Sequence, residues 1–216
     1  MKTISLSEIN HILAALTVLF CFLPLVITWK KNLFLFRPYL LISIFWAING
    51  ITYFPEIFSW EWYSKYLNDI TYVYNLLETC QIILIFYYIF QNPIFIYLIF
   101  LFVLFEVTMI YLWGYVGADN IIIGVGCFIT LILNIGAVIR YVFKSQPVNT
   151  EHALVFVYTG FAFYFTQFII TYTFVYLNFS RASLPYVVLI NYLSICIATS
   201  LISFGIAKHP DSSAHE

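Results

Sequence analysis

Two glutamic acids, Glu78 and Glu106, are the residues whose type and position could do chemistry in this sequence. Each lies inside a long apolar stretch, where an ionisable side chain costs about 3 kcal/mol to place in hydrocarbon. Two carboxyl groups that face each other in such surroundings share a proton. A pair of this kind senses pH, carries protons or holds a cation. The alternative is that each acid is protonated and hydrogen-bonds neighbouring helices together.

Depth along the helices predicts which polar side chains accompany these acids. Glu78 follows Asp69 by nine residues and Glu106 precedes Trp113 by seven, each counted from a helix end at the same membrane surface. At 1.5 Å per residue, both acids lie about 10 to 14 Å below that surface, so they can meet. The predicted site for a small ligand or a proton comprises Glu78, Glu106, Gln167, Asn191, Asn49, Asn75 and Gln81.

The remaining residues predict neither a metal site nor an enzyme. A catalytic zinc ion needs about three histidines around it. The four histidines here do not converge: His11, His152, His209 and His215. The sequence has no GxGD pair and no GxSxG-like elbow, and the last apolar stretch lacks the lysine that a retinal protein needs. We therefore expect no catalytic activity, no metal and no cofactor.

Composition places the chain in a lipid bilayer. Of its 216 residues, 63% are hydrophobic and only 9% are charged, and the mean hydropathy is +0.94. A soluble domain could not bury that much apolar surface. The formal net charge of −1 gives no field that would attract nucleic acid. All the cysteines lie in apolar stretches and are expected to be reduced thiols: Cys21, Cys80, Cys127 and Cys196.

Seven apolar stretches are each about as long as a membrane crossing, which takes about 20 residues. They cover residues 8–29, 33–54, 69–90, 94–113, 120–143, 152–177 and 184–207. The expected fold is therefore all-α, a polytopic bundle of seven transmembrane helices. Residues 1–207 form one transmembrane domain and 208–216 a short tail. The intervening segment 55–68 is rich in tryptophan and tyrosine, and we expect it to be a short helix on the membrane surface.

Orientation follows from the lysine and arginine residues near the helix ends, which are more abundant on the cytoplasmic side. One side collects Lys30, Lys31, Arg37, Arg140, Lys144 and Lys208. The other side has Lys2, Lys65 and Arg181. The N-terminus is therefore expected outside and the C-terminal tail in the cytoplasm, in a multi-pass protein of the cell (inner or plasma) membrane.

Tryptophans and glycines predict how the helices meet lipid and one another. Most tryptophans lie at or beyond predicted helix ends, as interfacial anchors do, whereas Trp46 lies within the second stretch. In the fifth stretch, small residues predict faces for close helix packing, namely Gly124, Gly126 and the pair Gly136-Ala137. Arg140, near the end of the same stretch, is expected to extend toward lipid phosphates.

The last two stretches resemble a known class of membrane module. They are similar, in general residue pattern and not in an exact motif, to short seven-helix membrane modules associated with bacterial sensor kinases. The segments concerned are VYTGFAFYFTQFIITYTFVYL and LPYVVLINYLSICIATSLISFGIAKH. Gly160, Asn191 and Gly205 carry the likeness. The resemblance implies a sensory or receptor-like input unit. The residues after Lys208 are too few for a kinase domain, so its output would pass through a membrane or cytoplasmic protein partner.

Three functions remain open from the sequence. The first is a sensor, receptor-like protein or adaptor whose polar cavity responds to a small ligand or to protons. The second is a small proton-coupled or cation-coupled transporter that uses the same two acids. The third is a non-catalytic subunit that stabilises a larger membrane complex. The lipid bilayer is the expected partner in all three.

Overall fold

The chain is all-helical wherever its structure is described. The computed structural model describes residues 6–54, 61–176 and 184–210, and within these ranges every regular element is a helix. The elements are α1 (Leu6–Lys30), the 3-10 helix η1 (Leu33–Leu35), α2 (Arg37–Thr52), α4 (Glu61–Phe90), α5 (Ile94–Val142), α6 (Asn149–Tyr176) and α7 (Leu184–Lys208). This confirms the predicted all-α class.

Five of these helices are long and apolar enough to cross a membrane, namely α1, α4, α5, α6 and α7. A helix inside lipid satisfies its own backbone amides, which is why apolar stretches of this length are helical. The expectation of a membrane-embedded, multi-pass protein is confirmed at this level.

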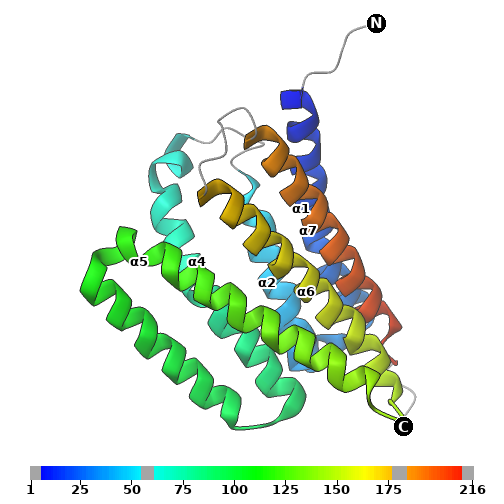
Figure 1. Cartoon of the computed structure of the whole chain (residues 1–216). Coiled ribbons are helices and arrows are strands. Elements are labelled where there is room, and N and C mark those ends of the chain that lie inside the picture. Colours follow the sequence, from blue (N-terminus) through cyan, green and yellow to red (C-terminus); the bar gives the residue numbers. More distant parts are fainter. Residues whose placement is uncertain (1–5, 55–60, 177–183, 211–216) are drawn as a thin grey trace, which may run out of the picture.

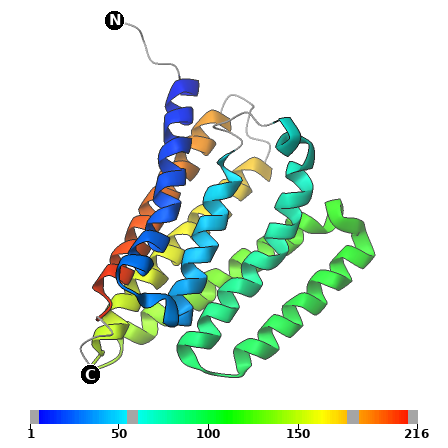
Figure 2. The same cartoon turned by 180° about the vertical axis from the view of Figure 1, so that it is seen from behind.

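The helices pack side by side as a closed circle (Figures 1 and 2). Each of α1, α2, α4, α5 and α6 packs against the next helix in the chain, and α7 closes the circle by packing on both α6 and α1. We call the end of the bundle where α1 begins its N-terminal end, and the end where α7 stops its C-terminal end. The two ends are at opposite sides of the bundle in both views.

The fourth and fifth predicted helices form one element that is interrupted at a single residue. Gly114 has φ 69° and ψ 171°, which is not helical, and only glycine takes such a conformation without steric cost. The chain reverses direction there (Figure 1), so that α5 consists of a first arm, residues 94–113, and a second arm, residues 115–142. The turn predicted over residues 114–119 is thus reduced to Gly114, and the helix resumes at once.

Other predicted boundaries shift at the loops. The second predicted helix is shorter, because η1 occupies residues 33–35 and Pro38 stands in the first turn of α2, where proline is tolerated. In the predicted surface segment 55–68, residues 55–60 lie outside the described ranges, and the rest belongs to α4, which begins at Glu61. Residues 211–216 of the predicted tail also lie outside these ranges.

Aromatic side chains fill the interior of the bundle. Trp46 of α2 is completely buried and stacks at 5.9 Å, between ring centroids, on Phe161 of α6. Its ring also meets Tyr164 edge-on at 5.1 Å, and the neighbouring Phe45 packs on Phe161 at 5.4 Å. Edge-to-face and offset pairs of this kind stabilise beyond their buried area. These rings join α2 to α6 across the bundle.

The residue that follows α7 is hydrogen-bonded to the connection after α1 and to α2. Lys31 Nζ donates a hydrogen bond of 2.6 Å to the carbonyl oxygen of His209. The Tyr39 hydroxyl lies 3.0 Å from His209 Nδ1 in a second hydrogen bond. The residue that follows α7 is therefore held against both α2 and the segment that connects α1 to η1.

Of the three glycines predicted to give the fifth helix a thin face, only one provides a close contact. A Cβ on Gly126 would lie 2.2 Å from Thr79 Oγ1 on α4 and 3.4 Å from Phe102 on the first arm. Gly124 and Gly136 have nothing within 4 Å of a Cβ, so the prediction was wrong for both. Among the described residues, Gly126 is therefore the predicted glycine at which this helix packs closely.

Candidate functional site

Glu78 lies on the side of α4 that faces the bundle interior. The residue is only 7% exposed, and one carboxyl oxygen, Oε1, is buried without a hydrogen-bond partner among the residues that the structure describes. The carboxyl interacts electrostatically with the side chains of Tyr74, Tyr164 and Cys127, which come from α4, α6 and the second arm of α5. A buried acid with an unsatisfied oxygen is costly to keep, so it marks a candidate site.

Tyr74 connects this acid to α2. It precedes Glu78 by four positions, so both side chains lie on the same face of α4. The amide nitrogen of Asn49 on α2 donates a hydrogen bond to the Tyr74 hydroxyl. Asn49 is itself buried, at 3% exposure. The polar contact therefore joins two helices inside the bundle, away from the lipid.

A second tyrosine extends the contacts to α7. The amide nitrogen of Asn191 lies 3.4 Å from the hydroxyl of Tyr53, the residue that caps α2. Tyr53 also interacts electrostatically with both Tyr74 and Tyr164. We call this group the Glu78 cluster; its members are Glu78, Asn49, Tyr53, Tyr74, Tyr164 and Asn191. It links α2, α4, α6 and α7.

Trp46 places an unsatisfied donor beside the cluster. Its indole nitrogen is buried and has no hydrogen-bond partner in the described ranges, and its ring packs against Tyr164, a cluster member. A buried donor or acceptor without a partner costs about 1 to 3 kcal/mol. The cluster region thus contains one unsatisfied acceptor, on Glu78, and one unsatisfied donor, on Trp46. Such a region can take up a proton, a small cation or a small hydrogen-bonding ligand.

Glu106 lies elsewhere, on the first arm of α5. It is 5% exposed, it also has a buried unpartnered Oε1, and it interacts electrostatically with Cys80 of α4. Cys80 is two positions after Glu78, which is about 200° around the helix axis. Among the residues that the structure describes, no hydrogen bond joins the two acids. The depth count made a meeting of the two acids possible, and a hydrogen-bonded pair is not formed among the described residues.

The other predicted site residues make separate contacts. Asn75 donates a hydrogen bond of 3.3 Å to Asp119 on the second arm of α5. Gln81 donates one of 3.0 Å to the carbonyl oxygen of Leu41 on α2. Gln167 is buried but donates to the hydroxyl of Thr171 on its own helix. These three side chains hold helices together or stay within one helix, and in the described part of the chain none of them hydrogen-bonds to Glu78.

Three tyrosines of the cluster were not among the predicted site residues. Tyr74 could have been found, since it stands one helical turn before Glu78. Tyr164 comes from α6 and Tyr53 from the end of α2, far from Glu78 in the sequence. Nothing in the sequence distinguishes these two among its 18 tyrosines. They are found only when the helices are assembled.

Comparison with known proteins identifies no relative of this chain. The chain matches no protein-family model, no curated protein and no solved structure. The candidate site is therefore defined by its geometry alone.

Proposed function

We propose that this chain is a non-enzymatic, receptor-like sensor or adaptor of the cell membrane. In this proposal, the Glu78 cluster takes up a proton or a small cation and thereby changes the packing of the helices that it links. One observation carries the proposal: a carboxyl group with an unsatisfied oxygen is buried where polar side chains of α2, α4, α6 and α7 come together. A membrane or cytoplasmic protein partner would receive the signal.

The proposed topology has seven crossings, with the N-terminus outside and the C-terminus in the cytoplasm. The two arms of α5 run in opposite directions from Gly114, which supports counting them as two crossings. The 16 residues of α2 span about 24 Å, less than a hydrocarbon core of about 30 Å. However, η1 precedes α2, and α2 packs between α1 and α4 within the bundle. Lys30, Arg37 and Arg140 lie at the C-terminal end, which supports a cytoplasmic location for it.

Binding at Glu78 can reach several helices because a carboxyl group changes its hydrogen-bonding role with its protonation state. The ionised group only accepts hydrogen bonds, whereas the protonated group also donates one. Tyr74 stands one helical turn before Glu78, and both Tyr74 and Tyr164 lie within the range of its charge, so these two tyrosines would reorient in response. Tyr74 accepts the hydrogen bond from Asn49, so the change would be transmitted to α2.

The Glu78→Gln variant tests proton uptake directly. Infrared difference spectra between acidic and alkaline pH should show a carboxyl carbonyl band in the unchanged protein. The part of this band that comes from Glu78 should be missing in Glu78→Gln, because an amide does not ionise. Glu106→Gln is the matched control, since it alters the other buried acid, and it should retain the Glu78 contribution. An unchanged carboxyl band in Glu78→Gln would contradict the proposal.

A distance measurement tests the change in packing. Spin labels on cysteines introduced at Ile51 of α2 and Ile170 of α6 would report the separation of these helices, since both positions are exposed. The four native cysteines would first be replaced by alanine. We expect the distance to change between acidic and alkaline pH, and Glu78→Gln to keep the acidic value throughout, because glutamine resembles the protonated acid. A pH-driven flux into vesicles, with unchanged distances, would favour a transporter instead.

A further inference from the structure

Two clefts lie at the C-terminal end of the bundle, away from the Glu78 cluster. The first, of about 400 Å³, lies between the ends of α4 and α5 and the beginning of α6. The second, of about 340 Å³, lies between the end of α4 and the two arms of α5. Both are lined by Phe90, Ala137 and Arg140, so they adjoin at these residues. We call the two together the composite cleft.

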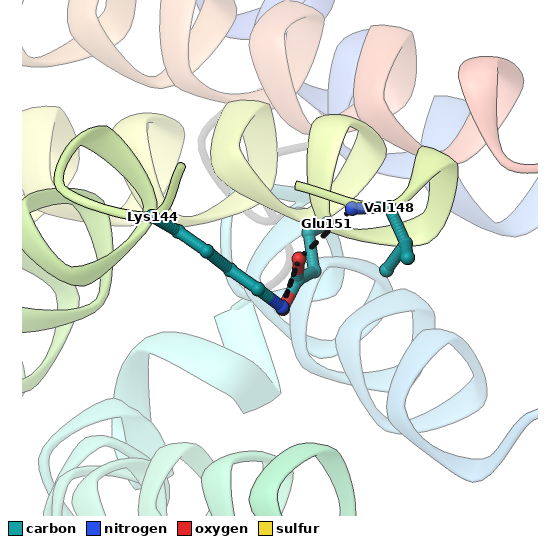
Figure 3. Close-up of polar contacts among 3 residues, drawn as sticks. All are labelled: Lys144, Val148 and Glu151. Atoms are coloured by element: carbon teal, nitrogen blue, oxygen red, sulfur yellow. Dashed lines mark hydrogen bonds and ion pairs between the residues drawn. The ribbon is translucent and has the colours of Figure 1, made fainter. Parts of the chain in front are cut away.

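The first part of the composite cleft is polar and positively charged. Lys144 Nζ donates hydrogen bonds of 2.7 Å to both carboxyl oxygens of Glu151, and the backbone N–H of Val148 donates one of 3.0 Å to Glu151. Figure 3 shows how these three residues lie. This ion pair neutralises Lys144. In the described part of the chain, no carboxylate lies within ion-pair distance of Arg140. Its guanidinium instead lies 5.0 Å from the centre of the Phe90 ring.

A second cation stands next to this part. The Arg37 guanidinium lies 5.2 Å from the centre of the ring of Tyr88, which lines the cleft. Lys144 is paired with Glu151, so its charge is balanced. Arg37 and Arg140 then give this part of the cleft an excess of positive charge. A guanidinium group binds phosphate with two parallel hydrogen bonds. The charge therefore favours an anion, and phosphate in particular.

The second part of the composite cleft is apolar. Apart from Asn92 and Arg140, its lining residues are Phe86, Phe90, Phe95, Ile132, Leu133, Gly136 and Ala137. Gly136 has no atom within 4 Å of where a Cβ would lie, so this position leaves the groove open. Ile132 precedes Arg140 by eight residues, about 12 Å along the helix. The groove thus extends from the charged end of α5 toward the middle of the membrane.

We propose that the composite cleft binds one molecule of an anionic phospholipid. Its phosphate group binds Arg140, and one acyl chain lies along Gly136 in the apolar groove. The match is one of both charge and polarity: an anion is complementary to the unpaired guanidinium, and a hydrocarbon chain to the aromatic groove beside it. A zwitterionic lipid carries an additional cation, which Arg37 and Arg140 repel. The lipid would hold α4 and the two arms of α5 together at this end.

Native mass spectrometry of the delipidated full-length protein tests the headgroup. The probes are phosphatidylglycerol and phosphatidylcholine with identical acyl chains. We expect the unchanged protein to prefer phosphatidylglycerol, and Arg140→Gln to lose about tenfold in affinity for it, as expected when a charged hydrogen bond is removed. Affinity for phosphatidylcholine should change less, because losing the bond to its phosphate is offset by losing the repulsion of its choline cation. A preference that survives Arg140→Gln, or displacement of the lipid by excess inorganic phosphate, would refute the proposal.

A matched pair of glycine variants tests the acyl-chain groove. Gly136→Leu places a side chain in the groove, and we expect it to weaken the binding of both lipids. Gly124→Leu is the control, because Gly124 lies on the same arm, is equally open and lines neither part of the composite cleft. Thermal unfolding of both variants would show that the bundle is intact. Equal lipid binding by the two variants would exclude the groove as the site of the chain.

Discussion

Gly160→Leu is expected to destroy the packed bundle, because α6 and α7 touch backbone to backbone at this position. A Cβ on Gly160 would lie 2.8 Å from the carbonyl oxygen of Ala198 on α7. The reciprocal contact is made by Gly205 of α7, whose Cβ would lie 2.6 Å from the carbonyl oxygen of Ala153 on α6. A backbone oxygen cannot rotate away as a side chain can. Room for even one methyl group is gained only by separating the helices.

The expected loss is about 1 to 3 kcal/mol of unfolding free energy for alanine at either glycine, and more for leucine. Thermal unfolding in detergent and the yield of monodisperse protein would measure it. Gly124→Ala and Gly136→Ala are the controls, because both positions are open. These should keep stability or raise it by up to about 1 kcal/mol, since alanine is the better helix former. If Gly160→Ala unfolded at the same temperature as its controls, α6 and α7 would not be in backbone contact at this position.

Trp46→Ala is expected to produce the other large loss of stability, about 3 to 5 kcal/mol. Trp46 is completely buried and contacts Phe45, Phe161 and Tyr164 through its ring. Lipid is as apolar as the bundle interior, so burying this ring gains little from leaving water. What the ring contributes is close contact with its neighbours, and those contacts are lost when a cavity is left.

Trp29→Ala is the matched control for this variant. Trp29 lies at the end of α1 with 68% of its side chain exposed, so its removal leaves no cavity and should cost under about 0.5 kcal/mol. Chemical or thermal unfolding in the same detergent compares the two directly. Trp46→Phe should fall between them, because it restores part of the contact. Similar losses for Trp46→Ala and Trp29→Ala would mean that the aromatic interior does not stabilise the fold.

The sequence was sufficient to identify the membrane class and to place most helix ends. Apolar stretches must satisfy their own backbone amides in lipid, and this requirement makes them helical wherever they occur. Polar residues, proline and glycine then mark where each helix stops, as at Phe90 before Gln91-Asn92-Pro93 and at Leu184 where α7 begins. Depth along a helix also follows from counting residues, which grouped Glu78, Asn49 and Asn191 as candidates. In the structure Asn49 and Asn191 hydrogen-bond to Tyr74 and Tyr53, which the count did not name.

Only the tertiary structure decided which way each side chain faces around its helix axis. Depth is shared by Glu78 and Glu106, yet one carboxyl group faces Tyr74 and Tyr164 while the other lies beside Cys80. In a soluble helix, the contrast between apolar and polar faces reveals the inward side. Here lipid and interior are both apolar, so that contrast is absent. For the same reason, the sequence could not distinguish Gly126 from Gly124, two positions before it. The structure shows that Gly126 packs tightly and that Gly124 faces open space.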